Sequence, residues 1–471
     1  MALSSMLLLL VALCSRLAAA QSTPAYDVIV IGAGVAGLKA ASDLRQANLR
    51  VLVLEARSRP YGRIDTQQPA GWPVSIELGA QWFHGSSNPV LAYARTLRNP
   101  SVTITSTGSG DDEATFNPAT GEEVSAADDT RWEDWFTEFE DSILPDLQEA
   151  DEANSRSVAD AVNDFMTVKR INDPLQRRGF LSRIETNYVQ EYAASANRLS
   201  LPYFNADSEM AGGDSVPSNY SSVFSRMVNA IQQSPSSLRL GMVVSSVTPL
   251  RATAGGAVVG VQVAATNTRT QRSETITGRF LLSTLPLGVL KASYRSIFAA
   301  GIDAGAAARQ KAIAALGMGL LNKVIMQFPT AFWTSKDLAG SNQWIGSLPL
   351  EDPAAVQWNE FFSLKQATGQ NVLVAFQAGD AAATVEKLGD KETVDSAMVA
   401  LRQMFGNPSL PNPTRYVITR WAQDPYALGS YSFVAVGATD GMRNTLCRTA
   451  GRLYFAVTND CSVRGYATSA A

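Results

Sequence analysis

The segment from Tyr26 to Ala56, YDVIVIGAGVAGLKAASDLRQANLRVLVLEA, constrains the fold more than any other part of the chain. An apolar run is followed by a glycine-rich turn, a helical pattern and a second apolar run, which together predict a βαβ unit. Gly32 permits the tight turn, Gly34 lets the backbone approach a pyrophosphate, and Gly37 lets the helix pack closely on the strand. Glu55 ends the second run, where a carboxylate binds ribose hydroxyl groups. The unit therefore predicts a dinucleotide site, with the phosphates at the helix N-terminus.

Length and composition indicate a folded protein with more than one packed unit. The chain has 471 residues, of which 46% are hydrophobic and 17% charged, and single cores rarely grow to that size. Its 39 basic and 43 acidic residues form no basic stripe, so we expect a small cationic molecule as partner and no nucleic acid. Acidic residues between positions 128 and 141 accompany apolar residues at helical spacing. We interpret them as the solvated side of a helix, with an acidic rim that concentrates polycations as the alternative.

Residues 1–20, MALSSMLLLLVALCSRLAAA, have the apolar run and small-residue end of a cleaved signal peptide. We therefore expect a secreted protein without membrane contact after cleavage, and an uncleaved anchor is the alternative interpretation. Beyond this segment the thiols are Cys447 and Cys461, which are candidates for one disulfide in an oxidising compartment. Asn219-Tyr220-Ser221 is a glycosylation sequon, in agreement with secretion. The sequence carries no prediction of the oligomeric state.

Five further segments resemble the flavin-containing amine oxidase family, in particular its polyamine oxidases. They are LEARSRPYGRIDT at 54–66, IELGAQWFHG at 76–85, STLPLGVLK at 283–291, MGLLNKVIMQFPTAFW at 318–333 and RWAQDPYALGSYSF at 420–433. The resemblance implies an α/β (α+β) fold of two domains, a Rossmann-like FAD-binding domain and a substrate-binding domain of mixed sheet and helices. The expected FAD-binding domain comprises residues 24–85, 206–290 and 415–471, and the expected substrate-binding domain comprises 86–205 and 291–414.

The same resemblance implies FAD as the cofactor and assigns residues to it. Besides the three glycines and Glu55, the implied cofactor-binding residues are Arg57, Arg63, Ala80, Gln81, Val243 and Trp421. The two arginines are phosphate-facing or structural cations, because a planar guanidinium suits oxyanions. Where the family has two adjacent glycines this chain has Tyr61-Gly62, so a side chain stands where backbone approaches the cofactor. No metal site is predicted.

The resemblance also assigns the reaction chemistry to particular side chains. Lys323 is implied as the lysine that holds a water beside the flavin, and its apolar surroundings predict a partner or a lowered pKa. His84, the one histidine of the chain, is implied in the amine site, where it titrates near neutral pH. The implied substrate-lining residues are His84, Glu191, Tyr431 and Tyr466, with Glu185 as an alternative carboxylate for a distal ammonium group.

The C-terminal segment departs from the family pattern. The family has a glycine and an acidic residue after the strand that corresponds to GRLYFA at 451–456, and this chain has Val457-Thr458-Asn459-Asp460. The family's closing helix is also absent from the sequence after Ala471. We therefore expect this segment to be degenerate or truncated, with FAD affinity as the property that it affects most.

These features together predict a secreted FAD-dependent oxidase of polyamines such as spermine, spermidine or their acetylated forms. Hydride transfer to the flavin and reoxidation by O2 would release H2O2 and an aldehyde. An L-amino acid oxidase of the same fold is one alternative, although no arginine matches the position that would hold a carboxylate. The other alternative is a secreted, non-catalytic relative whose FAD binding is weak or lost.

Overall fold

The computed structural model describes most of the chain. The described residues are 24–97, 102–108, 113–151, 153–206, 212–232, 237–253, 256–333, 343–349 and 358–457. The expected signal peptide, Cys461, Tyr466 and the departure from the family at 458–460 lie outside these residues, so the predictions that concern them stay predictions. Within the described ranges, no helix is both long and apolar enough to cross a membrane.

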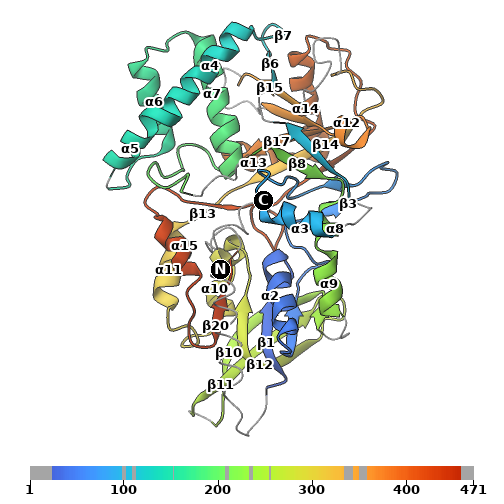
Figure 1. Cartoon of the computed structure of the whole chain (residues 1–471), viewed down its shortest axis with the longest axis vertical. Helices are drawn as coiled ribbons and strands as arrows, with labels where there is room; N and C mark the ends of the chain where they lie inside the picture. The colour runs from blue at the N-terminus through green and yellow to red at the C-terminus, as the bar shows by residue number, and fades with distance from the viewer. Residues whose placement is uncertain are drawn as a thin grey trace.

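Two large sheets organise the molecule, one in each lobe (Figure 1). The first has seven strands in the order β10-β11-β12-β1-β2-β9, with β20 pairing to β12. These strands are β1 (Tyr26–Ile31), β2 (Val51–Leu54), β9 (Leu238–Arg239), β10 (Met242–Arg251), β11 (Val258–Asn267), β12 (Ser273–Ser283) and β20 (Leu453–Phe455). β1 lies parallel to both β2 and β12. Helix α2 (Val35–Gln46) joins β1 to β2 and completes the predicted βαβ unit.

Alternation of side chains along β1 places an apolar core on each face of the first sheet. Val28 and Val30 point to the side covered by α2, α3 (Pro89–Thr96) and α9 (Ser225–Gln232). Ile29 and Ile31 point to the other side, covered by α10 (Leu287–Ile297), α11 (Ala306–Ala315) and α15 (Asp440–Leu446). Both faces are covered, so β1 needs a continuous apolar run rather than an alternating one. Its sequence, YDVIVI, supplies that run.

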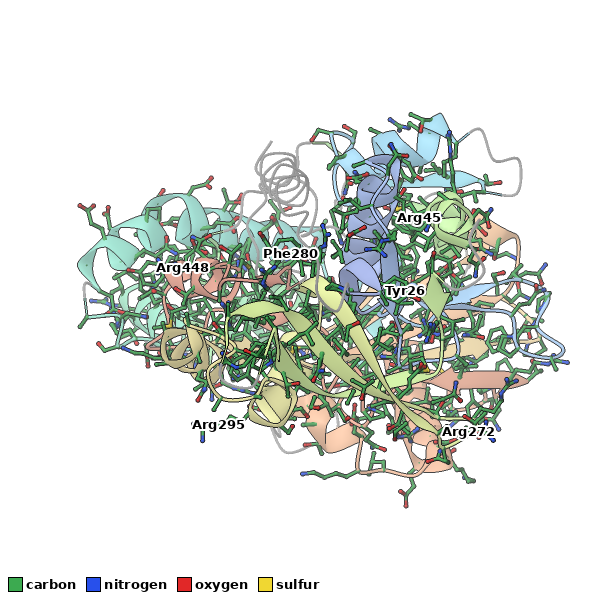
Figure 2. All side chains as sticks on the ribbon, turned by 90° about the horizontal axis from the view of Figure 1, so that it is seen from below. Tyr26, Arg45, Arg272, Phe280, Arg295 and Arg448 are labelled. Carbon is green, nitrogen blue, oxygen red and sulfur yellow. The ribbon has the colours of Figure 1, made fainter. Side chains whose placement is uncertain are left out.

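Helices α10 and α11 belong to the first lobe by packing. Ile297 and Ile313 lie in the same core as the strands of the first sheet. Figure 2 shows this lobe from below, with Arg272 at the turn between β11 and β12 and Arg295 extending from α10 away from the sheet. The sequence prediction begins the substrate domain at residue 291, whereas the packing continues the first lobe through α11.

The second sheet also has seven strands, in the order β18-β14-β17-β16-β15-β6-β7. They are β6 (Glu113–Asn117), β7 (Glu122–Glu123), β14 (Leu321–Gln327), β15 (Trp344–Ser347), β16 (Glu360–Ser363), β17 (Val372–Ala378) and β18 (Arg415–Ile418). Helix α14 (Asp390–Met404) covers one face through Val394, Ala397 and Leu401. The other face packs against Trp72 and Ile76, which come from the segment between the first lobe's β2 and helix α3. The active-site motifs at 76–85 and 318–333 therefore meet at this face.

A helical layer completes the second lobe (Figure 1). It consists of α4 (Ala126–Glu138), α5 (Leu144–Ala150), α6 (Val158–Val168), α7 (Pro174–Ile184) and the π-helical segments η1 (Phe139–Ile143) and η2 (Glu185–Gln190). Trp132, Phe136 and Phe139 are buried, as their helical spacing predicts. Several acidic residues between them are exposed or ion-paired, with Glu138 bound to Lys169 and Asp129 to Arg183.

Short strand pairs and helices connect these layers. The pairs are β3 (Thr66–Gln67) with β4 (Ile76–Glu77), β5 (Ile104–Gly108) with β8 (Asp214–Pro217), and β13 (Gly317–Met318) with β19 (Ser432–Phe433). The remaining helices are α8 (Tyr220–Val223), α12 (Lys365–Thr368) and α13 (Gly379–Val385). β4 and β8 flank the segment that carries the predicted histidine, so they set its position.

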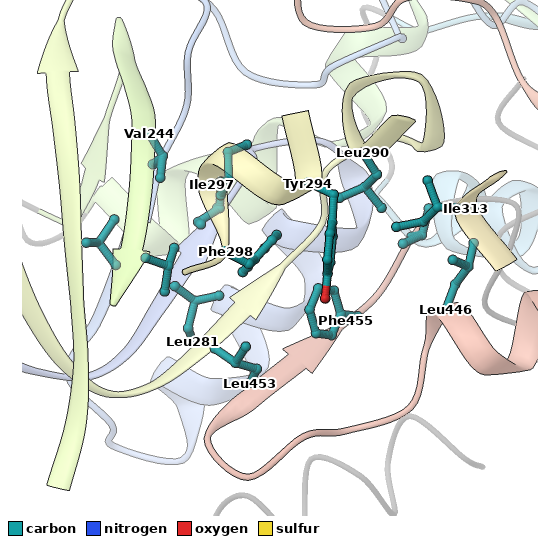
Figure 3. Packing of buried hydrophobic residues seen from close by; sticks show 14 of the residues in the cluster. Val244, Leu281, Leu290, Tyr294, Ile297, Phe298, Ile313, Leu446, Leu453 and Phe455 are labelled. Carbon is teal, nitrogen blue, oxygen red and sulfur yellow. The ribbon is translucent and has the colours of Figure 1, made fainter. Parts of the chain in front are cut away.

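A buried ion pair joins α11 to the C-terminal part of the first lobe. Arg309 is 1% exposed and its Nε donates to Asp303 Oδ2 at 2.7 Å. The guanidinium also donates to the carbonyls of Thr445, Leu446 and Arg448 at the end of α15, and it lies 3.7 Å from the ring centroid of Phe455. Figure 3 shows Phe455 and Leu446 among the packed apolar residues on this side of the first sheet. Arg309 therefore holds α15 and β20 against the first sheet.

We expect Arg309→Met to destabilise the protein strongly. The substitution leaves the Asp303 carboxylate buried without its cation, which costs about 3–5 kcal/mol in other proteins. Urea unfolding followed by circular dichroism measures the loss. Arg295→Met, on the exposed side of α10, is the matched control and should change the free energy of unfolding by less than about 0.5 kcal/mol. Equal effects of the two substitutions would contradict the role given to Arg309.

Candidate active site

The glycines of the first turn have the steric roles that the sequence predicts. Gly32 has a φ of 100° and a Cβ there would lie 2.4 Å from Thr284 Oγ1. A Cβ on Gly37 would lie 2.1 Å from the carbonyl oxygen of Gly32, so the helix start could not pack this closely. A Cβ on Gly34 would meet no atom within 4 Å. Gly34 therefore faces open space at the N-terminus of α2.

Glu55 closes the turn by accepting two backbone hydrogen bonds. Its carboxylate accepts from the N–H of Ala33 at 2.7 Å and from the N–H of Arg57 at 2.8 Å. Its own carbonyl accepts from Met242 N–H at 2.7 Å, which brings the neighbouring Val243 to the end of β2. A carboxylate has about four acceptor sites, so Glu55 retains acceptor capacity for a ribose. The predicted adenosine contacts, Glu55 and Val243, thus come together.

The two predicted arginines tie the loop after β2 to the 424–430 segment. Arg57 forms an ion pair with Asp424 at 2.6 Å, and its guanidinium lies 5.4 Å from the ring centroid of Tyr426. Arg63 donates to the carbonyl of Ser430. The sequence left two interpretations of these arginines, phosphate-facing or structural cations. The contacts with Asp424 and Ser430 correspond to the structural interpretation. Asp424 was not singled out in the sequence, because nothing local relates it to a residue 367 positions away.

Tyr61 adopts a backbone conformation that favours glycine. Its φ is 80°, in the left-handed region that costs an L residue about 1–2 kcal/mol. Its N–H donates to Ala33 O at 2.8 Å and its carbonyl accepts from Ile64 N–H at 3.2 Å. The half-buried ring packs against the core beside α2. The loop thus keeps a glycine-type conformation although it carries a tyrosine, and these contacts offset the strain.

The first lobe fits a bound dinucleotide by three observations. Gly34 leaves open space beside the helix start, no side chain caps that helix start, and Glu55 lies at the end of β2 with Val243 beside it. Uncapped N–H groups at a helix start attract phosphate. The residues present therefore suit the FAD that the motifs imply.

Lys323 of β14 lies in a buried cradle made by a single segment. The side chain is 3% exposed. Nζ donates to Gly79 O at 2.6 Å, to Gln81 Oε1 at 2.9 Å and to Glu77 O at 3.3 Å. Burial lowers the pKa of Lys323 to about 7, and the negative charge of Glu77 acts in the opposite direction. The predicted lysine therefore has both a set of partners and a lowered pKa.

Glu77 is a buried carboxylate that the sequence analysis did not single out. It is 7% exposed, and it accepts from the Thr66 hydroxyl at 2.7 Å and from Tyr220 N–H at 2.8 Å. Burial raises the pKa of Glu77 to about 7, although these hydrogen bonds and the charge of Lys323 lower it. Burial therefore shifts the pKa of Glu77 upward and that of Lys323 downward, each to about 7. The sequence signal that could have identified Glu77 is its position within the motif IELGAQWFHG.

Aromatic rings surround the lysine on the second sheet. Nζ of Lys323 lies 5.3 Å from the ring centroid of Trp82 and 5.9 Å from that of Phe376. Trp82 stacks on Trp344 at 5.6 Å and meets Phe362 edge-on at 5.2 Å. These rings keep water away from Lys323 and add cation–π attraction to its ammonium form. They come from β15, β16 and β17 and from the segment after β4.

Trp421 is held beside the lysine segment by hydrogen bonds on both its backbone and its ring. Its N–H donates to Asn322 Oδ1 at 3.0 Å, and its indole Nε1 donates to Leu78 O at 3.2 Å. A Cβ on Gly79 would lie 3.3 Å from the indole ring, so this ring lies against the backbone next to Ala80. The structure therefore brings together the predicted residues Ala80, Gln81, Lys323 and Trp421.

His84 pairs with an aspartate on β8. Its Nδ1 lies 2.8 Å from Asp214 Oδ2, and the other carboxylate oxygen accepts from Gly85 N–H at 2.8 Å. A carboxylate is acceptor-only, so the proton of this bond belongs to Nδ1, which leaves Nε2 as an acceptor in neutral imidazole. Burial disfavours the charged ring, but the bond to Asp214 and the charges of Glu191 and Asp214 outweigh it, and the pKa of His84 is raised above 6.5.

Glu191 and Tyr431, the other predicted substrate residues that the structure describes, lie around the end of η2. The Tyr431 hydroxyl donates to the carbonyl of Gln190. The charge of Glu191 acts on both His84 and Tyr431, which places that exposed carboxylate near the histidine. Burial raises the pKa of Glu185 to about 7 without a contribution from another charged group. His84, Asp214, Glu191 and Tyr431 therefore form one side of the site.

Known proteins resemble this chain over nearly its whole length. The family described as flavin containing amine oxidoreductase matches residues 35–468. Probable polyamine oxidase 4 of Arabidopsis thaliana is 29% identical over 459 residues, which cover 94% of this chain and 84% of that protein. Lysine-specific histone demethylase 1 homolog 1 of Arabidopsis thaliana is 29% identical over 91% of this chain but only 49% of that protein. A solved putrescine oxidase double mutant with redesigned cofactor binding has a TM-score of 0.70 at 18% identity, covering 94% of this chain and 96% of that chain. This structural similarity confirms the two-domain fold.

The His84–Asp214 pair predicts a directly measurable pKa difference. Because the chain has one histidine, a single imidazole signal appears in a carbon-edited NMR titration. We expect it to titrate above 6.5 in the wild type and at a lower pH in Asp214→Asn, since the variant removes the charge that stabilises imidazolium. The stability from this pair is therefore complete below 6.5 and is lost as pH rises through the raised pKa. An unchanged titration in Asp214→Asn would contradict the pairing.

The strain at Tyr61 predicts that glycine is more stabilising than alanine at this position, the reverse of the usual order. Tyr61→Ala and Tyr61→Gly both lose the ring, and only the alanine variant keeps a Cβ at positive φ. We expect the glycine variant to be more stable by about 1 kcal/mol, measured by urea unfolding. The same two substitutions at exposed Tyr416 in β18 are the control, and there alanine should be the more stable. A common order at both positions would show that Tyr61 is unstrained.

Proposed function

The chain belongs to the family of flavin containing amine oxidoreductases, and on that premise we propose that it oxidises polyamines. It is an FAD-dependent amine oxidase, and an amine and O2 are the substrates that this family implies. The observation that carries the proposal is the buried Lys323 cradle, which joins the motif at 76–85 to Trp421. Polyamine as the substrate is supported by the similarity to a polyamine oxidase along 94% of the chain.

The residues that would hold FAD lie in two groups. Gly32, Gly34, Gly37, Glu55 and Val243 would hold its dinucleotide part. Ala80, Gln81 and Trp421 would lie at its ring, beside Lys323. When bound, FAD accepts a hydride from the carbon next to the amine nitrogen. The chain's own contribution is to bind the amine, exclude water and hold protons at defined atoms.

Charge at one side of the site favours a cationic substrate. Asp214 and Glu191 both act on His84, and carboxylates attract the ammonium groups of a polyamine. They would repel the carboxylate of an L-amino acid, so the amino acid oxidase alternative is less well supported. Nε2 of neutral His84 can accept a proton from an arriving ammonium, and the amine must lose that proton before its carbon can release hydride. The reaction is therefore expected to speed up as pH rises through the pKa of His84.

Three finer parts of the proposal rest on the sequence. We propose that residues 1–20 direct secretion, that O2 is the final oxidant, and that the products are an aldehyde, the remaining amine and H2O2. The balance is one amine, one O2 and one water, since water hydrolyses the imine that hydride loss leaves. The non-catalytic alternative depends on Tyr61 and on the segment after Val457.

Anaerobic spermine should bleach the flavin absorption of the purified protein, and air should restore it. Lys323→Met should slow this reduction by at least about 100-fold, because it removes the group that holds a proton at the ring. Lys391→Met, at a lysine whose side chain is 85% exposed, is the control and should leave the rate unchanged. Stopped-flow absorbance measures each rate. A flavin that binds but stays oxidised with spermine, spermidine and their acetylated forms would contradict the polyamine proposal.

A further inference from the structure

We propose that Tyr431 is a positioning residue, whose hydroxyl group holds the helix end that carries Glu191 and so keeps the Glu191 carboxylate near His84. The ring of Tyr431 remains a predicted wall of the substrate site, and the new role belongs to the hydroxyl group. This role rests on the proposed amine oxidase function only in its consequence for the amine.

The hydroxyl group of Tyr431 is bound to the protein backbone. It donates to the carbonyl of Gln190, the last residue of η2. Burial and the charge of Glu191 raise the pKa of Tyr431 well above its ordinary value, so the hydroxyl group stays protonated. A phenol has one O–H, and this bond uses it. Tyr431 therefore gives its one donor to the helix.

The Gln190 carbonyl lies where that helix ends. The last carbonyls of a helix have no partner within it. Here Ala193 N–H donates to Gln190 O at 3.2 Å, and Ala194 N–H donates to Val189 O at 3.1 Å. This pair of bonds is a Schellman motif, whose left-handed residue is usually glycine, but Ala193 has a φ of 52°. The helix end is therefore strained, and the bond from the Tyr431 hydroxyl group helps to offset that strain.

The same contacts hold the helix end against the connector that leads into β14. Gly319 N–H donates to Tyr431 O at 2.7 Å, and Leu320 N–H donates to Ala193 O at 2.8 Å. A Cβ on Gly319 would lie 2.7 Å from Ala193 O, so these backbones meet without room for a side chain. Tyr431 thus contacts the helix end through its hydroxyl group and the neighbouring connector through its backbone.

Glu191 is the residue that follows the held carbonyl. The Gln190 carbonyl and the Glu191 N–H belong to one planar peptide group. The oxygen of that group accepts from Tyr431, and its N–H donates to Tyr188 O. Both ends of the peptide group are therefore bonded, which restricts the direction in which the Glu191 side chain leaves the backbone.

Two charged groups raise the pKa of His84. Asp214 on β8 is hydrogen-bonded to the ring, and Glu191 acts on the ring through its charge. An interaction between charges weakens with distance, so the contribution of Glu191 depends on where the helix end holds it. A displaced Glu191 would lower the pKa of His84. The imidazole would then be a weaker acceptor for the proton of an arriving ammonium group.

Three variants and a control test the role of the hydroxyl group. Tyr431→Phe removes it and keeps the ring, Glu191→Gln removes the charge and keeps the side-chain length, and the double variant combines them. Tyr188→Phe is the matched control, because Tyr188 lies in η2, is 3% exposed and donates to Glu140 Oε1 at 3.2 Å. Each FAD-loaded protein is studied without amine. A carbon-edited NMR titration follows the one histidine of the chain, and amide hydrogen exchange follows residues 189–194.

Tyr431→Phe should speed amide exchange in residues 189–194 by about 3- to 10-fold, as the loss of one hydrogen bond implies. It should also move the His84 titration to lower pH, in the same direction as Glu191→Gln. In the Glu191→Gln background, Tyr431→Phe should move the titration by less than half as much as in the wild type, because the charge through which it acts is absent. Tyr188→Phe should leave the His84 titration at its wild-type position.

An unshifted His84 titration in Tyr431→Phe would overturn the proposal. A shift of the same size in the Glu191→Gln background would also overturn it, since Tyr431 would then act by another route. An equal shift in Tyr188→Phe would do so as well, because a general loosening of η2 would explain both. All of these measurements are made without amine. A wild type that binds FAD but is not reduced by spermine would therefore contradict the proposed function separately.

Discussion

The burial of the Lys323 ammonium is the interaction on which the site depends. An ammonium taken out of water must find acceptors in the protein, and Lys323 finds them in the backbone carbonyls and the amide between Glu77 and Gln81. Those acceptors lie about 240 residues away along the chain, with a separation of 246 for Glu77. The need to pair this one charge therefore holds the segment after β4 against β14. The segment after β4 and the second sheet therefore meet at this contact.

Charge is distributed around that contact in a way that suits an amine oxidase. The interior holds Lys323 and Glu77, and burial lowers the pKa of the lysine and raises that of the glutamate, each to about 7. Asp214 is hydrogen-bonded to His84, and the charges of Asp214 and Glu191 both raise the pKa of that histidine. Such carboxylates would attract the polycation proposed as substrate, and the neutral imidazole could accept its proton. Aromatic rings from the second sheet exclude water from the lysine.

The glycine turn of the first lobe requires backbone segments to lie very close together. Where a larger residue stands in this region, other contacts offset the strain. Gly32 and Gly37 are needed because any Cβ would meet atoms at 2.4 and 2.1 Å. Tyr61 has a φ of 80°, a backbone conformation that glycine adopts more easily than other residues. A backbone hydrogen bond to Ala33 and the packing of its ring hold it in that conformation. Arg309 uses its whole guanidinium to hold the C-terminal helix of this lobe. Local strain and buried charge are thus both tied to the segments that would surround the cofactor.

The sequence by itself determined the βαβ unit, the glycine turn and the identity of the residues in each active-site motif. These follow from short-range rules: the apolar periodicity of adjacent residues, the steric needs of Gly32 and Gly37, and fixed spacing within a motif. Only the tertiary structure decided the partners. Asp214 for His84, Asp424 for Arg57 and the carbonyls for Lys323 are separated from them by 130, 367 and up to 246 residues. It also placed α10 and α11 on the first sheet. Hydrogen bonds and burial arise between residues that no local pattern relates, and for that reason the sequence could name the groups of this site but not their pairing.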